Sequence, residues 1–309
     1  MISIIIPCYN ASKYVTTCYS HLIKQTEGGW EAIFINDGSK DDTLDILHSI
    51  ASNDSRIKVY SQQNKGAAKA REYGVKHAKG KYISFLDIDD YLSYNAIKIF
   101  SDIIKQTKAD IIVSSFNIID GYKKYTPRKI TFNRITSIEY LKQILTGNCG
   151  WELCAKVYKK ELFNKSIETP EHFRIGEDAA VFIQLVSRAS NIVGINEPIY
   201  NYIQHTQSAS HVKSIKYAEE TIEAAFFIEK KLRESGIYNE IKNNISSMFL
   251  LFLSNSFSKG YLGNKHQYIM YISKNHINFK SLLQIPIIKS IYILIVYFTN
   301  GYITKFLKR

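Results

Sequence analysis

Acidic side chains follow two apolar segments of the chain, at the point where each segment ends. Asp37 comes directly after the mostly apolar segment 31–36, and Asp87-Ile88-Asp89-Asp90 comes directly after the mostly apolar segment 82–86. Three carboxylates within four residues repel one another, and a hard divalent cation such as Mg²⁺ or Mn²⁺ relieves that repulsion by binding their oxygens. The spacing therefore predicts a cation site at 87–90, with a solvated acidic turn that caps the next helix as the alternative.

The elements that must position these carboxylates alternate along the first half of the chain. Apolar runs predict strands at 2–6, 31–36, 57–61, 82–86 and 110–116. Helical patterns lie between them at 14–25, 66–77 and 95–107, and another helix follows a capping-box pattern of Ser39 and Asp42 and continues through Ile50. This alternation predicts a mostly parallel sheet with helices on both faces.

Ligands of open parallel sheets bind outside the carboxyl ends of the strands. We therefore expect Asp37, the 87–90 cluster and Pro7-Cys8-Tyr9-Asn10, which follows the first strand, to lie along one rim. The alternative for Asp37 is a structural role, in which it forms the turn before Gly38 and caps the following helix.

The alternation weakens after residue 117. The pattern predicts a hairpin or excursion at 122–132, a short helix at 137–145, a strand at 151–158 and a helix at 178–189. A final pair of strands is expected at 192–196 and 200–204, and helices from about 216 to the end.

Composition excludes several classes of protein. The 309 residues are 45% hydrophobic and 22% charged, which is typical of globular chains and not of disordered ones. The four cysteines are too few and too scattered for a disulfide scaffold. The N-terminus has no basic stretch followed by an apolar run, so we expect no secretory signal and a cytoplasmic location.

The positive charge is concentrated at the C-terminal end. The net charge is +12, and residues 241–309 hold nine Lys and Arg with no Asp or Glu. A nearly neutral body with a basic tail predicts a local anionic partner and argues against nucleic-acid binding. The unbroken apolar run 291–298 is far shorter than the roughly 20 residues of a spanning helix. We therefore expect residues 281–309 to contact a membrane surface, with packing on the rest of the chain as the alternative.

Four ordered motifs resemble those of the family 2 glycosyltransferases of GT-A fold that build bacterial surface polysaccharides. They are Pro7-Cys8-Tyr9-Asn10, Asn36-Asp37-Gly38-Ser39, Asn64-Lys65-Gly66 with Ala70-Arg71, and Phe85-Leu86-Asp87-Ile88-Asp89-Asp90. The resemblance is close to about residue 115 and looser to about 211. It implies an α/β fold of GT-A type, Rossmann-like, followed by a helical C-terminal region. One departure is Glu72, where family members usually have Asn.

The resemblance implies roles for the residues of the rim. Asp37 would accept a hydrogen bond from the uracil N3–H, Tyr9 would lie against the base, and Arg71 would hold the nucleotide end. Asp87 would contact the ribose or the water shell of the metal, and Asp89 would bind the Mn²⁺ or Mg²⁺ that bridges the diphosphate. The remaining donor contacts are Pro7 and Asn10, with Asp90 as a neighbouring metal ligand. Lys65 is a candidate for approaching the phosphates of the donor, or else is a solvated loop lysine.

The second half would supply the base and the acceptor contacts. By the resemblance, Asp178 would be the catalytic base and Glu177 would orient the acceptor or the diphosphate. A first-turn carboxylate favoured by the helix dipole is the alternative for Asp178. Trp151 is a candidate for stacking on a sugar, or else a core residue. His205 and His211 are candidates for touching phosphate or metal, or else belong to a surface loop.

The resemblance implies an inverting, metal-dependent transfer of one sugar, a hexose or N-acetylhexosamine, from a UDP-sugar to a saccharide. We expect a lipid-linked acceptor, on a polyprenyl diphosphate, in capsule or O-antigen synthesis at the inner face of the cell membrane. A soluble or teichoic-acid-like acceptor and a non-catalytic glycan-binding module are the alternatives, and the oligomeric state stays open. The implied catalytic domain covers 1–215, with a nucleotide-binding half (1–115) and an acceptor half (116–215), followed by a helical region at 216–309.

Overall fold

The computed structural model describes residues 1–126, 129–204, 214–258 and 266–298. Packing divides the chain into two compact units. Unit 1 comprises 1–136, 152–167 and 188–205, and unit 2 comprises 137–151, 168–187 and 206–309. The expected end of the catalytic domain at residue 215 is a statement about function, which this division by packing does not test, so it stays a prediction.

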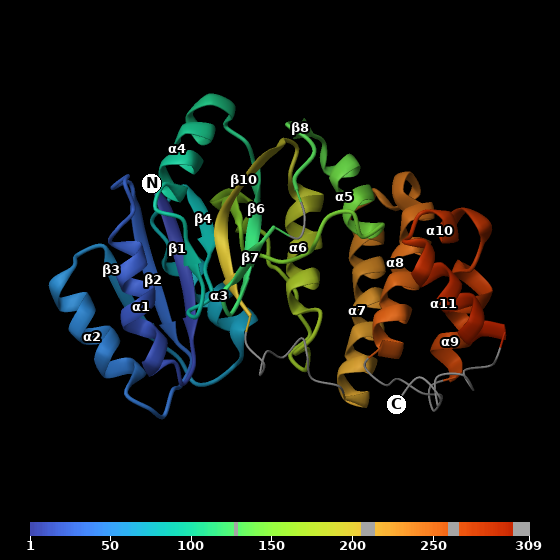
Figure 1. The fold of residues 1–309 in the computed structure, drawn as a ribbon, viewed down its shortest axis with the longest axis horizontal. Coiled ribbons are helices and arrows are strands. Elements are labelled where there is room, and N and C mark those ends of the chain that lie inside the picture. Colours follow the sequence, from blue (N-terminus) through green and yellow to red (C-terminus); the bar gives the residue numbers. More distant parts are fainter. Residues whose placement is uncertain (127–128, 205–213, 259–265, 299–309) are drawn as a thin grey trace. The chain divides into compact units, whose positions relative to one another are not determined.

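Unit 1 is built on a central sheet (Figure 1). The described residues form ten strands in the order β3-β2-β1-β4-β9-β6-β10-β5, with β7 on β6 and β8 on β10. The strands β3-β2-β1-β4 are parallel, as are β6 and β10, whereas β9 runs antiparallel between β4 and β6. The strand bounds are β1 Ile2–Cys8, β2 Trp30–Asn36, β3 Ile57–Ser61, β4 Tyr82–Phe85, β5 Tyr91–Leu92, β6 Ile111–Asp120, β7 Lys123–Tyr125, β8 Arg134–Ile135, β9 Lys156–Lys159 and β10 Ile192–Ile203.

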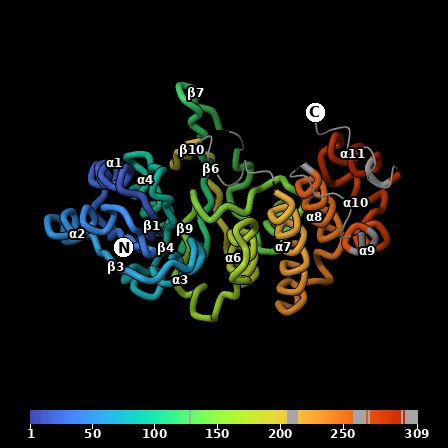
Figure 2. The backbone as a smooth tube through the Cα atoms, turned by 90° about the horizontal axis from the view of Figure 1, so that it is seen from below, coloured from blue at the N-terminus to red at the C-terminus, as the bar shows by residue number. Residues whose placement is uncertain are grey.

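Helices cover both faces of this sheet, as the sequence predicts. Alternate β1 residues such as Ile4 pack in one core with Val15, Leu47 and Phe100 from three of the helices. On the other face, Gly74 of α3 lies directly against Ile5. The helices of unit 1 are α1 Ser12–Leu22, α2 Thr43–Asn53, α3 Ala67–His77 and α4 Ala96–Thr107, with a short 3-10 helix at Lys160–Phe163. Figure 2 shows the β6–β7 hairpin standing out from the sheet.

Unit 2 is helical in the part that the structure describes. Its helices are α5 Ser137–Leu145, α6 Glu177–Arg188 (whose last residue belongs to unit 1), α7 Ile215–Glu234, α8 Tyr238–Ser258, α9 His266–His276, α10 Phe279–Leu283 and α11 Ile287–Phe298. Helix α8 is the centre of this packing, because it contacts α5, α7, α9, α10 and α11, and it lies beside α7 in both views (Figures 1 and 2). Among the described helices, none combines the length and the apolar character needed to span a bilayer.

Three expected elements differ from the structure. The two strands expected at 192–196 and 200–204 are one strand, β10, which passes Pro198 by two irregularities in its pairing with β6. The strand expected from 151 begins only at Lys156, after a turn in which Ala155 has φ +56°. The capping box expected at Ser39 is absent, because α2 begins at Thr43 and its N-cap residue is Asp42. The Ser39 hydroxyl lies before the helix and accepts a hydrogen bond from the Asn10 amide.

Candidate active site

The carboxyl ends of β1, β2 and β4 form one rim of unit 1. Cys8 at the end of β1 pairs with Asn36 at the end of β2, and Ile5 pairs with Phe85 at the end of β4. The residues that follow these ends are therefore neighbours, so the rim brings together Tyr9, Asp37 and the 87–90 cluster.

Asp37 sits in a cradle formed by the loop after β3. Its Oδ1 accepts hydrogen bonds from Gln62 Nε2 (2.7 Å) and the Lys65 amide (2.9 Å), and its Oδ2 accepts one from the Gly66 amide (2.8 Å). A carboxylate offers about four acceptor positions, so three filled positions leave about one for a ligand N–H. Sequence reasoning missed Gln62. The backbone amide of Lys65 supports Asp37, and the predicted approach of the Lys65 side chain to phosphate stays a prediction.

The turn after β1 presents Tyr9 to solvent. Asn10 adopts φ +48°, and its side-chain oxygen accepts a hydrogen bond from the Lys40 amide at 2.9 Å. This contact ties the turn to the loop that follows β2. Tyr9 is 50% exposed, so its ring is available to a ligand at the rim, while Pro7 is half-buried within β1.

Arg71 reaches the cluster from helix α3. Its Nη2 donates to Asp87 Oδ1 at 2.8 Å, and the arginine is buried while the Asp87 side chain is partly exposed. Asp89 is half-buried on the same turn. Arg71 and Asp87, which were predicted to serve the donor separately, thus form an ion pair in this structure.

Asp90 points into the protein and holds the turn in place. It is 2% exposed, and it accepts hydrogen bonds from the Tyr200 hydroxyl (2.6 Å) and the Ile203 amide (2.7 Å). Burial, together with the charge of Asp87, raises the pKa of Asp90 to about 8. The Tyr200 oxygen also accepts a hydrogen bond from the Asp87 amide at 3.3 Å. These two contacts fill about half of the acceptor positions of the Asp90 carboxylate. They support a positioning role, and its predicted role as a metal ligand stays a prediction. Tyr200 was not anticipated from sequence.

Asp87 and Asp89, the more exposed carboxylates of the turn, suit a divalent cation that binds through few protein ligands. No three His, Cys, Asp or Glu side chains of the described residues converge as a complete metal cage. Mg²⁺ characteristically binds through one or two carboxylates, with substrate phosphates and water completing the set. Asp87 and Asp89 match that habit, since both are acidic, adjacent on one turn and only partly buried.

Unit 2 holds the predicted acceptor-side residues that the structure describes. Glu177 and Asp178 form the first turn of α6 and are half-buried. Trp151 is half-buried and packs edge-on against Phe252, with ring centroids 4.7 Å apart, so part of its surface serves the helical core. His205 and His211 lie outside the described residues.

Comparison with known sequences gives one family. The model of the family described as "Glycosyl transferase family 2" matches residues 3–167. The uncharacterized glycosyltransferase EpsJ of Bacillus subtilis is 29% identical over 218 residues, covering 69% of this chain and 63% of EpsJ. Glycosyltransferase GlyG of Streptococcus pneumoniae is 29% identical over 242 residues, covering 72% of this chain and 77% of GlyG. The minor teichoic acid biosynthesis protein GgaB of B. subtilis is 29% identical over 69% of this chain and 24% of GgaB.

Solved structures share the fold. S. aureus TarS 1–349 in complex with UDP-GlcNAc superposes with a TM-score of 0.65 at 18% identity, covering 97% of this chain and 92% of TarS 1–349. A mannosyltransferase of Pyrobaculum calidifontis, solved with GDP-Man and Mn²⁺, superposes with a TM-score of 0.56 at 11% identity, covering 99% of this chain and 84% of that one. At these identities the likeness establishes the α/β architecture alone.

Proposed function

Because this chain belongs to glycosyl transferase family 2, we propose that it is an inverting glycosyltransferase that moves one hexosyl or N-acetylhexosaminyl unit from a UDP-sugar to a saccharide acceptor. The observation that carries the proposal is the rim of unit 1, where the exposed Tyr9 and the cradled Asp37 accompany the acidic 87–90 turn. An aromatic face, an acceptor for an imide N–H and a cation site together suit the uridine and the diphosphate of such a donor.

The proposed donor contacts follow from the chemistry of these side chains. The one open acceptor position of Asp37 would receive the uracil N3–H, and the Tyr9 ring would stack on the base. Pro7, Asn10 and Lys65 would frame the nucleotide, and Arg71 would place positive charge at its diphosphate end.

A divalent cation completes the proposed donor site. Asp89 and Asp87 would hold Mn²⁺ or Mg²⁺, which supplies neutralisation of the negative charge that develops on the leaving diphosphate. Asp90 would keep their turn in position through its contacts with Tyr200 and Ile203. Arg71 would remain beside Asp87 and limit the repulsion among the three carboxylates.

Asp178 is the proposed base. With diphosphate as the leaving group, the reaction needs one protein base, which takes the proton from the acceptor hydroxyl as that oxygen bonds to the anomeric carbon and the bond to UDP breaks. A single displacement inverts the anomeric configuration, through a transition state with oxocarbenium character as in glycoside hydrolysis. Glu177, Trp151, His205 and His211 remain proposed contacts of the acceptor or diphosphate.

Replacement of the base tests the proposal. Asp178→Asn should retain UDP binding, measured calorimetrically, but lose transfer by about 10²–10⁴-fold, the usual contribution of a general base. Asp45→Asn is a matched control, because Asp45 is also an acidic residue in the first turn of a helix. Transfer by Asp178→Asn near the wild-type rate, or an equal loss in Asp45→Asn, would contradict the assignment.

For the acceptor, we propose a lipid-linked saccharide, presented on a polyprenyl diphosphate at the inner face of the cell membrane. Helices α10 and α11 carry large apolar side chains that are exposed, including Leu283 (69%) and Ile287 (74%). Neither helix has an acidic residue, and Lys280 and Lys289 lie on them. Exposed apolar residues beside lysines favour a helix that lies in the interface of an anionic membrane.

Liposome flotation tests this location. The wild-type protein should bind vesicles that contain anionic lipid, and Leu283→Gln with Ile287→Gln should abolish binding without reducing the free energy of unfolding. Ile215→Gln is the control, because Ile215 is also an exposed isoleucine (64%) but lies on α7. Wild-type protein that stays free of vesicles at low and physiological salt would refute membrane association.

A second acceptor class has one observation in its favour. The relative GgaB is named for minor teichoic acid biosynthesis, which supports a soluble or cell-wall polymer as the acceptor of this chain. Under that alternative α10 and α11 would pack against another chain, so a size measurement combined with the liposome assay separates the two.

A further inference from the structure

Helix α7 contacts the segment that leads into Asp178. Glu220 is 2% exposed, and its Oε2 accepts hydrogen bonds from the backbone amides of Arg174 (2.9 Å) and Ile175 (3.2 Å). One helical turn further along α7, Glu223 Oε2 lies 3.2 Å from His172 Nε2. One buried carboxylate thus fixes two successive peptide groups, three and four residues before Asp178.

The same helix closes on the segment at Gly176. Gly176 has φ +89°, and a Cβ atom at that position would lie 2.6 Å from the Cβ of Ala224. The left-handed conformation and the close approach both require glycine here. Because the Gly176 carbonyl accepts the Ala180 amide at 2.9 Å, the first turn of α6 begins from this contact.

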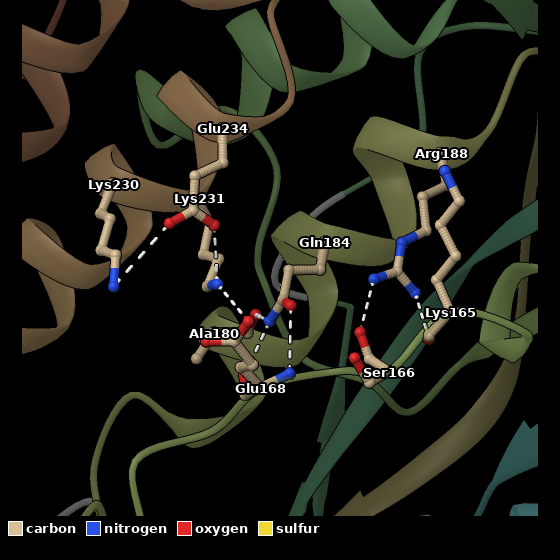
Figure 3. A network of polar contacts seen from close by, with 9 residues as sticks. All are labelled: Lys165, Ser166, Glu168, Ala180, Gln184, Arg188, Lys230, Lys231 and Glu234. Atoms are coloured by element: carbon tan, nitrogen blue, oxygen red, sulfur yellow. Dashed lines mark hydrogen bonds and ion pairs between the residues drawn. The ribbon is translucent and has the colours of Figure 1, made fainter.

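The far end of the segment is also attached to α7 (Figure 3). Lys231 Nζ donates to Glu168 Oε1 at 2.7 Å and to Glu234 Oε2 at 2.8 Å. On the α6 side, the Gln184 side chain bonds the Glu168 carbonyl (2.8 Å) and amide (3.1 Å). Segment 168–176 is therefore held at both ends by α7, through Lys231 at one end and Glu220 at the other.

Within the part of the chain that the structure describes, one oxygen of the buried Glu220 carboxylate is unpaired, which packing of the helix alone does not require. This oxygen, Oε1, is buried and has no hydrogen-bond partner among the described residues. Buried polar atoms are nearly always paired, so an unpaired carboxylate oxygen marks a group retained for another reason. An apolar side chain would pack on α7 without this cost, but it would leave the amides of Arg174 and Ile175 without an acceptor.

We propose that Glu220 is a positioning residue for the proton transfer, because it sets the backbone that presents the Asp178 carboxylate. The inference rests on the proposed base role of Asp178. Residue 220 lies outside the region 3–167 that matches the family model, so the contact belongs to the C-terminal helices of this chain. Its effect falls on turnover and not on donor binding, since the proposed donor residues belong to unit 1.

The test compares two buried glutamates of one helix. Glu220→Ala should lower kcat for transfer by about 10- to 100-fold, the size expected for a reacting group displaced by about 1 Å. KM for the UDP-sugar and UDP affinity should stay unchanged, and Glu220→Gln, which keeps an acceptor oxygen, should recover most of kcat. Glu229→Ala is the matched control, because Glu229 is 6% exposed on α7 and its partners are Arg233 and Tyr238.

A double variant separates positioning from a general loss of structure. If Glu220 acts through Asp178, adding Glu220→Ala to Asp178→Asn should reduce the residual rate no further. A further loss in the double variant, or equal losses of kcat in Glu220→Ala and Glu229→Ala, would overturn the inference. A wrong base assignment would give a different result from a wrong role for Glu220, because Asp178→Asn alone would then transfer sugar at the wild-type rate.

Discussion

Tyr200→Phe removes a single hydroxyl from beneath the acidic turn. That hydroxyl donates to Asp90 Oδ2 at 2.6 Å and accepts the Asp87 amide at 3.3 Å, and the tyrosine is fully buried. The loss leaves a buried carboxyl oxygen and a backbone amide without their partner. The change adds no bulk, so its cost reports these two contacts.

The magnitude depends on the charge of Asp90. Because burial raises the pKa of Asp90 to about 8, the carboxyl is protonated at pH 6, and losing a neutral hydrogen bond should cost about 1 kcal/mol. At pH 9 it is ionised, and a buried charge that loses its donor should cost about 2 kcal/mol, because uptake of a proton limits any larger loss. Tyr200 remains a donor throughout, since burial raises the pKa of its hydroxyl well above 10.

Urea denaturation in metal-free buffer at both pH values measures this cost. Tyr158→Phe is the matched control, because Tyr158 is equally buried and its hydroxyl donates to the Leu153 carbonyl at 3.0 Å, which has no charge to gain. We expect about 1 kcal/mol for this control at either pH. Tyr200→Phe should also weaken Mn²⁺-dependent UDP binding by several-fold. Equal, pH-independent losses in the two variants with unchanged UDP affinity would refute the reasoning.

Three further predictions concern the rim and its supports. Gly38→Ala should lower both the free energy of unfolding and UDP affinity, measured by urea denaturation and calorimetry, because φ is +73° and the new Cβ would lie 2.8 Å from a backbone nitrogen. Arg71→Met should weaken UDP binding about 10-fold or more in calorimetry, because it unpairs Asp87 and removes a charge-assisted contact; an unchanged Kd would rule this out. Burial acts to raise the pKa of Asp41, but hydrogen bonds from Thr43 and Ser12 outweigh it and lower that pKa to about 2. This stabilisation is present above pH 4 and lost as the pH falls toward 2, so Asp41→Asn should cost up to about 1 kcal/mol at pH 7, after allowing for solvent screening, and less at pH 3.

The parallel half of the sheet could be predicted because its strands are buried on both faces. The run Ile2–Ile6 is apolar except for the buried Ser3, which is the pattern of a central parallel strand. Once these strands were placed, the rule on carboxyl ends brought Asp37 and Asp87 to one rim. The irregular β10 could not be found this way, because Pro198 reads as a break in the strand where the structure has irregular pairing.

The supports of the site were invisible for a different reason. Tyr200 is 110 residues from Asp90 in the sequence, and Glu220 is 46 residues from Arg174. No spacing pattern encodes contacts of that separation, and Tyr and Glu are ordinary residues for a strand and a helix. Local chemistry therefore indicated the residues that are proposed to face a ligand, whereas the residues behind them emerge only from tertiary packing.

The interleaving of the two units constrains how the protein can be made. Helix α5 buries Tyr140, Leu141 and Ile144 and contacts α8, yet the ribosome delivers α8 only after the strands that complete the sheet. At ordinary elongation rates that interval is on the order of ten seconds. During this interval the apolar face of α5 cannot pack against α8, and Glu168 cannot form its ion pair with Lys231. The nascent chain therefore passes through a stage in which the sheet is complete while the apolar face of α5 still lacks α8. A chaperone that binds exposed apolar side chains would matter most at that stage.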